Sequence, residues 1–283
     1  MIFAVRNAVT KIILNRESME YISFLFKAGA AFAFTVALYF FMMTRGSLII
    51  ESLLGRIGPS AQVYWIYRNR FLIWLTDRPL VISAILLFNY RRLTDGVVAC
   101  LNPTLEGKSV LQASCAFGDI SRKIADKCLK DGAKRVVISD LVANEITHAR
   151  KKLGEAAFGG RVFFVKENIL ELAHEDASFD YVVVFFLFHE LPLLMKSAAL
   201  KEAARVLKPG GKIVFGEFHR PGPWVLRTSG RVFFKVFEPY AAEMWDEFDP
   251  VSILNGEGGG SWKFSKKTFF GGNYQVFSAE KTD

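Results

Sequence analysis

The chain has 283 residues and a formal net charge of +8, which suits one α/β domain with an extension rather than a minimal domain. Residues 1–103 hold 11 Lys and Arg against 5 Asp and Glu, whereas the remainder holds 25 against 23, so most of the excess positive charge lies in the first third. This distribution argues against a nucleic-acid-binding domain, and the three cysteines match no CxxC zinc site. A basic, apolar N-terminal region instead favours contact with an anionic membrane surface.

The first 60 residues form the first predicted region. Residues 1–16 carry three basic side chains and no acidic one, which is typical of either an organelle-targeting segment or a short interfacial helix. Residues 22–44 contain Lys27 as their only charge and exceed the roughly 20 residues that a bilayer-spanning helix needs. We therefore expect a transmembrane helix here, and the alternative is a helix buried in a protein core.

Residues 61–100 form a second region, in which aromatic and basic side chains are interleaved. They are Tyr64, Trp65, Tyr67, Arg68, Arg70, Trp74 and Arg78, and Pro79 opens a further apolar helical run. Such a mixture is typical of a helix that lies among lipid headgroups. The alternative is an amphipathic lid over the following domain, and both interpretations hold if a substrate comes from the membrane.

From about Leu101 the pattern changes to alternating strands and helices. Five apolar segments are predicted as strands, namely residues 108–114, 134–140, 161–168, 179–188 and 212–218. Three amphipathic segments are predicted as helices, namely residues 119–133, 142–159 and 193–207, and a turn is predicted at 208–211. This order predicts an α/β, doubly wound, Rossmann-like domain over residues 101–283.

Three predicted strand ends carry residues suited to a nucleotide, because ligands of such sheets bind at the carboxyl ends of the strands. A loop with one glycine, Gly118, follows the first strand. Asp140 ends the second strand, where an acid can bind a ribose hydroxyl. Asn168 follows the third strand, where an amide could meet an adenine edge. Taken alone, these features also fit a dinucleotide-binding enzyme.

The segment 176–218, above all "RVLKPGGKIVFGEF", resembles class I S-adenosylmethionine-dependent methyltransferases over about residues 104–218. The resemblance implies that fold, with a hydrophobic N-terminal helical extension, and S-adenosylmethionine as cofactor. It implies these cofactor-binding residues: Gln112, Ser114, Ala116, Gly118, Asp119, Asp140, Asn168 and Phe186. The family's loop reads acidic-x-Gly-x-Gly-x-Gly, so Gln112 replaces an acid, and Ser114 and Ala116 replace glycines at the expense of freedom at positive φ. Asp119 has an alternative role as an N-cap or first-turn acid.

A narrower resemblance, over roughly residues 61–279, is to the RquA family of rhodoquinone biosynthesis proteins. It is carried by "LQASCAFGD", "FFLFHELP", "HRPGPW", "FEPYA" and "TFFGGNYQVF". This resemblance implies conversion of ubiquinone to rhodoquinone, in which S-adenosylmethionine and manganese serve to place an amino group on the quinone ring. The chain departs from the family in its hydrophobic N-terminal 50 residues, in Arg68-Asn69 at the place of a histidine-proline pair, and in Glu217 and His219. These departures leave open a diverged paralogue with a related quinone reaction.

Candidate catalytic residues follow the fourth and fifth predicted strands. His189 and Glu190 follow the fourth, whereas Glu217 and His219 lie two positions apart and hence on one strand face. Together these four groups could hold manganese, and Glu217 and His219 are the candidate metal ligands. They could instead bind quinone oxygens, or a histidine could act as a base. Tyr274 is a further candidate, because aromatic side chains near a polar edge suit a flat, apolar quinone ring. The segment "TFFGGNYQ" that contains it also fits an ordinary hairpin.

These observations lead to one leading hypothesis and two alternatives. The leading hypothesis is a membrane-associated enzyme that aminates a ubiquinone-type lipid to give rhodoquinone. The alternatives are methyl transfer to a quinone or another lipophilic substrate, and a non-catalytic assembly protein with a methyltransferase fold. The expected partners are the membrane and the lipid quinone, without nucleic acid, and the oligomeric state is left open. The expected location is a bacterial inner membrane facing the cytoplasm, or a mitochondrial inner membrane facing the matrix.

Overall fold

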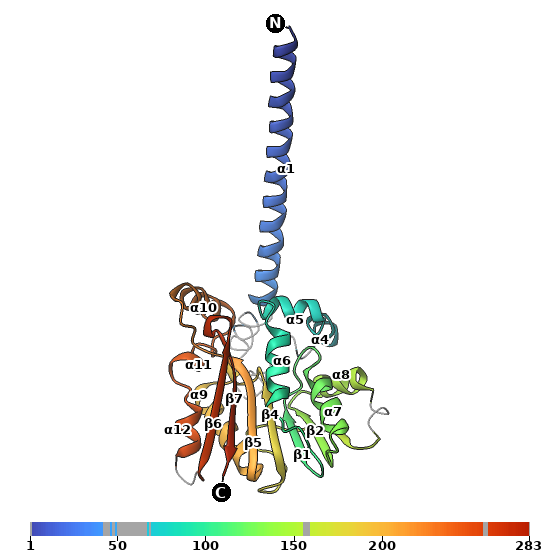
Figure 1. The fold of residues 1–283 in the computed structure, drawn as a ribbon, viewed down its shortest axis with the longest axis vertical. Helices are drawn as coiled ribbons and strands as arrows, with labels where there is room; N and C mark the ends of the chain where they lie inside the picture. Colours follow the sequence, from blue (N-terminus) through green and yellow to red (C-terminus); the bar gives the residue numbers. More distant parts are fainter. Residues whose placement is uncertain are drawn as a thin grey trace.

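The computed structural model describes residues 2–41, 46, 49, 67, 69–154, 159–256 and 260–282. Helix α1 (Ile2–Phe41) projects away from a compact α/β body (Figure 1). Its window Ser18–Tyr39 has a mean hydropathy of 1.6 and is long and apolar enough to cross a membrane, as a signal sequence near an N-terminus also is. None of this window is buried by the described chain, so the alternative of a core helix is not supported. The last residues of the predicted span, 42–44, lie outside the described residues.

Between α1 and the sheet, the described residues include the helices α4 (Arg70–Thr76), α5 (Pro79–Ile85) and α6 (Tyr90–Ala99). We call α4 and α5 together the lid. The side chain of Asn69 caps α4 by accepting the backbone N–H of Phe71 at 2.9 Å, and Pro79 occupies the first turn of α5, where no N–H is needed. Of the interleaved aromatic and basic residues, Tyr64, Trp65 and Arg68 lie outside the described residues.

The body is built on a seven-stranded sheet in the order β3-β2-β1-β4-β5-β7-β6. The strands are β1 (Ser109–Ala113), β2 (Arg135–Asp140), β3 (Val162–Lys166), β4 (Phe179–Phe185), β5 (Leu207–Phe218), β6 (Trp262–Phe269) and β7 (Tyr274–Lys281). The first five run parallel, whereas β7 is antiparallel to both β5 and β6. All seven residues of β4 are buried, as expected for the middle strand of a sheet covered on both faces. The predicted α/β parallel core is therefore confirmed.

The predicted turn at residues 208–211 is present, but as an irregularity within β5 rather than a boundary before it. Leu207 pairs with Phe179 and Lys212 pairs with Tyr181, so the intervening residues bulge out of register. Gly210 takes the left-handed conformation that this requires, with φ of 71°.

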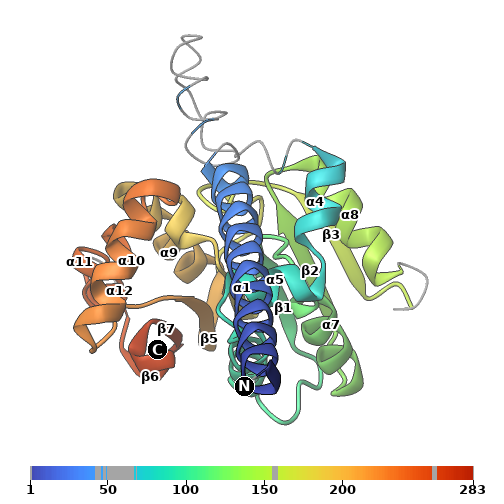
Figure 2. The ribbon, with the colours of Figure 1, turned by 90° about the horizontal axis from the view of Figure 1, so that it is seen from above.

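Helices cover both faces of the sheet (Figures 1 and 2). The described helices that follow β1 are α7 (Ile120–Lys130), α8 (Ala143–Leu153), α9 (Leu193–Val206), α10 (Trp224–Phe237), α11 (Glu243–Asp246) and α12 (Pro250–Asn255). α7 contacts both α6 and α8, and α9 contacts α12. Helix α8 ends earlier than predicted, because Gly154 at φ of 72° closes it in the left-handed conformation. The hairpin interpretation of the tail is confirmed, since Phe269 of β6 pairs with Tyr274 of β7.

Candidate functional site

A mainly apolar cavity of about 480 Å³ lies at the carboxyl ends of β1, β2 and β4. Its walls also include residues of the lid and of α10. Eight of the predicted site residues line it: Ser114, Ala116, Asp140, Asn168, Phe186, His189, Glu190 and Tyr274. The structure thus brings five of the eight predicted cofactor-binding residues and all three predicted catalytic residues to one cavity.

The loop after β1 keeps its shape without the usual glycines. Ser114 has a φ of 84°, a conformation in which a side chain is strained, whereas Ala116 has no positive φ. Gln112 lies fully buried beneath the loop, where its amide nitrogen donates to the carbonyl of Ser114 at 3.0 Å and to the hydroxyl of Ser121 at 2.7 Å. Its Oε1 is buried and has no hydrogen-bond partner in the described chain. The structure therefore places Gln112 as a support for the loop rather than as part of the cavity wall.

Tyr90, which the sequence analysis did not single out, shapes the end of this loop. Its hydroxyl oxygen accepts the backbone N–H groups of Asp119 and Ile120 at 2.5 and 3.0 Å, and so caps α7. It also lies 2.9 Å from Oδ1 of Asp119, to which it donates. A Cβ atom on Gly118 would lie 2.2 Å from the same oxygen. Gly118 and Asp119 do not line the cavity. Asp119 occupies the N-cap position of α7, but its own side chain makes no capping hydrogen bond.

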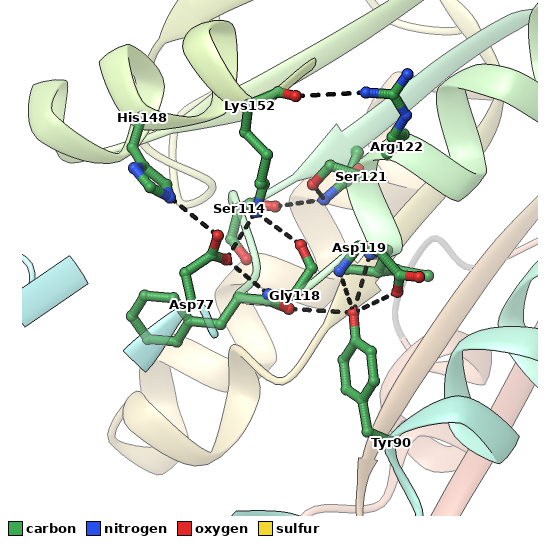
Figure 3. Close-up of polar contacts among 12 residues, drawn as sticks. Asp77, Tyr90, Ser114, Gly118, Asp119, Ser121, Arg122, His148 and Lys152 are labelled. Atoms are coloured by element: carbon green, nitrogen blue, oxygen red, sulfur yellow. Dashed lines mark hydrogen bonds and ion pairs between the residues drawn. The ribbon is translucent and has the colours of Figure 1, made fainter. Parts of the chain in front are cut away.

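Asp77 ties the lid to this loop (Figure 3). Its Oδ1 accepts the backbone N–H of Gly118 at 2.7 Å and the ammonium of Lys152 at 2.7 Å, and its Oδ2 lies 3.0 Å from Nε2 of His148. Lys152 also donates to the carbonyl of Gly118 at 2.7 Å. The lid is thus fastened to both α8 and the loop that follows β1. Asp77 is the single acid between residues 61 and 93, which is the signal that could have identified it.

Asp140, at the end of β2, turns its carboxylate toward the loop. It accepts the backbone N–H groups of Cys115 and Val142, each at 2.8 Å. Burial raises the pKa of Asp140 to about 6, although these two donors act in the opposite direction. Glu145 of α8 is also buried, and burial followed by the charge of Asp140 raises its pKa. Its Oε1 has no hydrogen-bond partner among the described residues. Asn168 uses its Oδ1 to accept the N–H of Leu170 at 3.1 Å.

Glu217 and His189 form a buried pair at the ends of β5 and β4. Glu217 is fully buried and accepts the backbone N–H of Phe218 at 2.8 Å, while Nδ1 of His189 lies 3.1 Å from its Oε1. Burial lowers the pKa of His189, but the charge and hydrogen bond of Glu217 outweigh it, so the pKa rises to about 9. At neutral pH His189 is therefore a cation, and Nε2 is the ring nitrogen left for a ligand.

Glu190 is the second polar group on this side of the cavity. The hydroxyl of Tyr67 donates a hydrogen bond to its Oε1. Burial raises the pKa of Glu190 to about 8, even though the charge of His189 opposes this shift. Such a carboxyl group titrates within the range in which proton transfer near neutral pH is efficient.

The structure does not bring Glu217 and His219 together as metal ligands. The carboxylate of Glu217 is used by His189, whereas Nδ1 of His219 lies 2.7 Å from the carbonyl of Gly272. The other ring nitrogen of His219 lies 3.5 Å from the ammonium of Lys266, and a cation there opposes metal binding. No cluster of three or more His, Cys, Asp or Glu suited to a metal occurs among the residues that the structure describes. These residues do not fit manganese, and no chemical step is assigned to it.

Aromatic rings form the remaining wall of the cavity. Phe186 makes edge-to-face contacts with Phe218 and Tyr274 at centroid distances of 5.3 and 6.1 Å. The ring of Tyr67 also lines the cavity and stacks on Phe117 at 5.7 Å. Ring pairs of this kind present both flat faces and edges to an enclosed ligand.

The comparisons with known proteins agree with this geometry. An S-adenosylmethionine-dependent methyltransferase from Aquifex aeolicus superimposes with a TM-score of 0.53 and 18% identity, over 75% of this chain and 98% of that one. A putative methyltransferase from Bacillus halodurans superimposes with a TM-score of 0.50 and 17% identity, over 68% of this chain and 98% of that one. The fold is therefore the Rossmann-like class I methyltransferase fold with an N-terminal apolar helix.

Relatives found by sequence are similar over part of their length. The ubiquinone/menaquinone biosynthesis C-methyltransferase UbiE of Rickettsia prowazekii (strain Madrid E) is 34% identical over 131 residues, which are 46% of this chain and 50% of that protein. The demethylmenaquinone methyltransferase of Bacillus velezensis is 27% identical over 163 residues, 58% of this chain and 67% of that protein. This chain thus spans half to two thirds of the length of these relatives. The profile of the ubiE/COQ5 methyltransferase family matches residues 80–252, and because this is more than half of the chain, the protein belongs to that family.

Proposed function

We propose that the protein is an S-adenosylmethionine-dependent transferase that modifies the ring of a ubiquinone-type lipid, and that the transferred group is a methyl group. The observation that carries this proposal is that Ser114, Asp140, His189 and Tyr274 all line the same cavity. The names of the Rickettsia and Bacillus relatives support a quinone ring as the methyl acceptor.

The residues on the β1 and β2 side fit a cationic cofactor. Asp140 and Glu145 are buried acids whose pKa values are raised, which is the condition that a nearby positive charge would relieve. Ser114 and Asp140 would hold S-adenosylmethionine, and Asn168 would contact it from the end of β3. When bound, the cofactor supplies an electrophilic methyl group on a sulfonium.

The residues on the β4 and β5 side would act on the quinone ring. His189, held as a cation by Glu217, donates from Nε2 to a ring oxygen and stabilises negative charge on it. The methyl acceptor is a ring carbon that still bears a hydrogen, in the reduced hydroquinone form of a ubiquinone-type precursor, and Glu190 in its ionised form accepts the proton that this carbon loses when the methyl group is bound. Phe186, Phe218 and Tyr274 exclude water from this side and hold the flat ring.

Amination to rhodoquinone is the second candidate reaction. Two observations favour it: the tail motifs shared with the RquA family, and Gln112, which removes a negative charge from beneath the cofactor loop. The family resemblance also implies manganese for that reaction, which the described residues do not fit.

One labelling experiment separates the candidates. The full chain is expressed in a ubiquinone-producing host, and its membranes are supplied with S-adenosylmethionine carrying ¹³C in the methyl group and ¹⁵N in the amino group. Relative to membranes of the same host without the chain, additional ¹³C in a quinone supports methyl transfer, and ¹⁵N in a quinone supports amination. A quinone with neither label, from protein that binds the cofactor in calorimetry, overturns both. Absence of cofactor binding would point to the non-catalytic alternative.

We also propose that α1 attaches the enzyme to a membrane, with the body on the side that holds S-adenosylmethionine, either bacterial cytoplasm or mitochondrial matrix. The exposed apolar window Ser18–Tyr39 supports this. Fractionation tests it: full-length protein in the high-speed supernatant without detergent would overturn the attachment.

A further inference from the structure

Large apolar side chains are exposed on both the lid and α10. On and beside the lid they are Phe71, Trp74, Leu80, Leu87 and Phe88, and on α10 they are Trp224, Val225, Val232 and Val236. Trp224 is the most exposed of those on α10, at 71%. A set of this size on two neighbouring elements marks an interaction surface rather than scattered exposure. We call these residues the apolar rim.

The apolar rim lies where α1 meets the body. The hydroxyl of Tyr39, the last residue of the apolar window, lies 3.3 Å from the hydroxyl of Thr76 at the end of α4. α1 also contacts α10. Figures 1 and 2 show the foot of α1 between α5 and α10, at the same end of the body. A bilayer crossed by α1 would therefore have its surface at the level of the lid and α10.

The charge of this end fits an anionic surface. α10 holds Arg227, Arg231 and Lys235 and no acidic residue, and their spacing of four places them along one side of the helix. Arg231 also pairs with Asp246 at 3.0 Å. On the lid, the guanidinium of Arg78 lies 3.8 Å above the ring of Trp74. Basic residues beside tryptophan and aliphatic side chains are typical of helices that lie in a lipid interface.

The cavity reaches the surface within the apolar rim. Leu87 lines the cavity and is also 50% exposed, so it belongs to both. From the other side, Leu226, Ser229 and Phe233 of α10 line the same cavity. The opening is thus bordered by the two elements that carry the exposed apolar side chains.

We propose that the lid and α10 form a membrane-contacting face around the cavity mouth, that its partner is an anionic bilayer surface, and that a lipid substrate reaches the cavity sideways from the bilayer. The identity of that substrate as a quinone rests on the proposed function, whereas the contact with lipid does not. In this proposal α10 lies in the lipid interface in addition to the helices of the lid.

Tryptophan fluorescence tests the contact directly. Full-length protein is reconstituted into phosphatidylcholine vesicles, with or without phosphatidylglycerol, that carry brominated acyl chains as quenchers. Replacing Trp224 by Phe is expected to lower the quenched fraction, and more so with phosphatidylglycerol present, because Trp224 contributes to it. Trp262→Phe, on edge strand β6, is the control: it removes a tryptophan that lies away from the lipid, so the quenched fraction is expected to rise slightly and not to fall. An unchanged quenched fraction in Trp224→Phe would overturn the proposal.

A second measurement tests the access route. Val236→Glu replaces a rim residue that is 37% exposed, and Val251→Glu replaces a residue of α12 that is 36% exposed and away from the rim. Val236→Glu is expected to raise the KM for a long-tailed quinone in vesicles at least tenfold. It should leave turnover of a short-tailed quinone in buffer unchanged. The control Val251→Glu should change neither quantity. Equal effects on both quinones would overturn the route. If the wild-type chain converts no quinone at all, the proposed function fails, while the quenching result still decides the lipid contact.

Discussion

Replacement of Glu217 by Gln removes the buried negative charge that faces His189 and preserves the size of the side chain. Glu217 is fully buried, and it accepts the N–H of Phe218 at 2.8 Å as well as a hydrogen bond from His189. Removal of one partner of such a pair leaves an uncompensated buried charge and commonly costs about 3–5 kcal/mol. In the variant, burial remains and Glu217 no longer opposes it, so the pKa of His189 should fall below its usual value.

The pKa of His189 makes this prediction specific to pH. A histidine with its folded pKa raised from 6.5 to about 9 contributes roughly 3 kcal/mol to the free energy of unfolding. This contribution is fully present below pH 6.5 and is lost as the pH rises through about 9, because the folded state then also releases the proton. The wild-type chain should therefore lose more stability over this interval than Glu217→Gln does.

Urea unfolding in detergent at pH 6 and at pH 9.5 measures the free energy of unfolding of the wild-type chain and of Glu217→Gln. We expect the gap in unfolding free energy between wild type and Glu217→Gln to shrink by roughly 3 kcal/mol at the higher pH. Glu171→Gln, which changes an exposed carboxylate, controls for the overall change of charge. A gap that is the same at both pH values would refute the coupling of Glu217 to His189.

Three further substitutions test the loop and the lid. Gly118→Ala should destabilise the protein far more than Gly154→Ala in thermal unfolding, because both glycines have positive φ but only Gly118 would place a Cβ 2.2 Å from Tyr90. Asp140→Asn should weaken S-adenosylmethionine binding about tenfold, or roughly 1.4 kcal/mol, in calorimetry. Wild-type binding should strengthen as the pH rises through about 6, where Asp140 ionises, and a variant without this pH dependence would support the assignment. Asp77→Asn should speed hydrogen exchange of the N–H of Gly118, because a neutral amide oxygen is a weaker acceptor for this N–H than the carboxylate of Asp77, and unchanged exchange would contradict the fastening of the lid.

The α/β core could be predicted from the sequence because local patterns specify it. An apolar run such as residues 179–185 has few alternatives to a strand buried on both faces, and Asp140 at the end of its strand follows directly from the strand boundary. The bulge at residues 208–211 could not be placed, because it depends on the register between β4 and β5 rather than on the turn sequence itself.

The polar contacts of the site were less predictable, because they join distant parts of the chain. Spacing put Glu217 and His219 on one strand face, but Glu217 instead meets His189, 28 positions earlier, while His219 turns to Gly272. The role of Tyr90 likewise depends on a contact across 29 positions to Asp119. No local pattern encodes such pairings, so the sequence indicated the residue types at the cavity but not their partners.

The contacts of Asp77 and Tyr90 have a consequence for how the protein folds. Tyr90 satisfies the first backbone N–H groups of α7, and Asp77 satisfies that of Gly118, so the loop that would seat the cofactor is completed by residues that precede the sheet. A fragment that begins at residue 101 would contain every strand and yet leave these donors without their acceptors, each at a cost of about 1–3 kcal/mol if it stayed buried. The smallest autonomous folding unit should therefore begin upstream of Asp77, and the lid and the loop should open and close as a single cooperative segment.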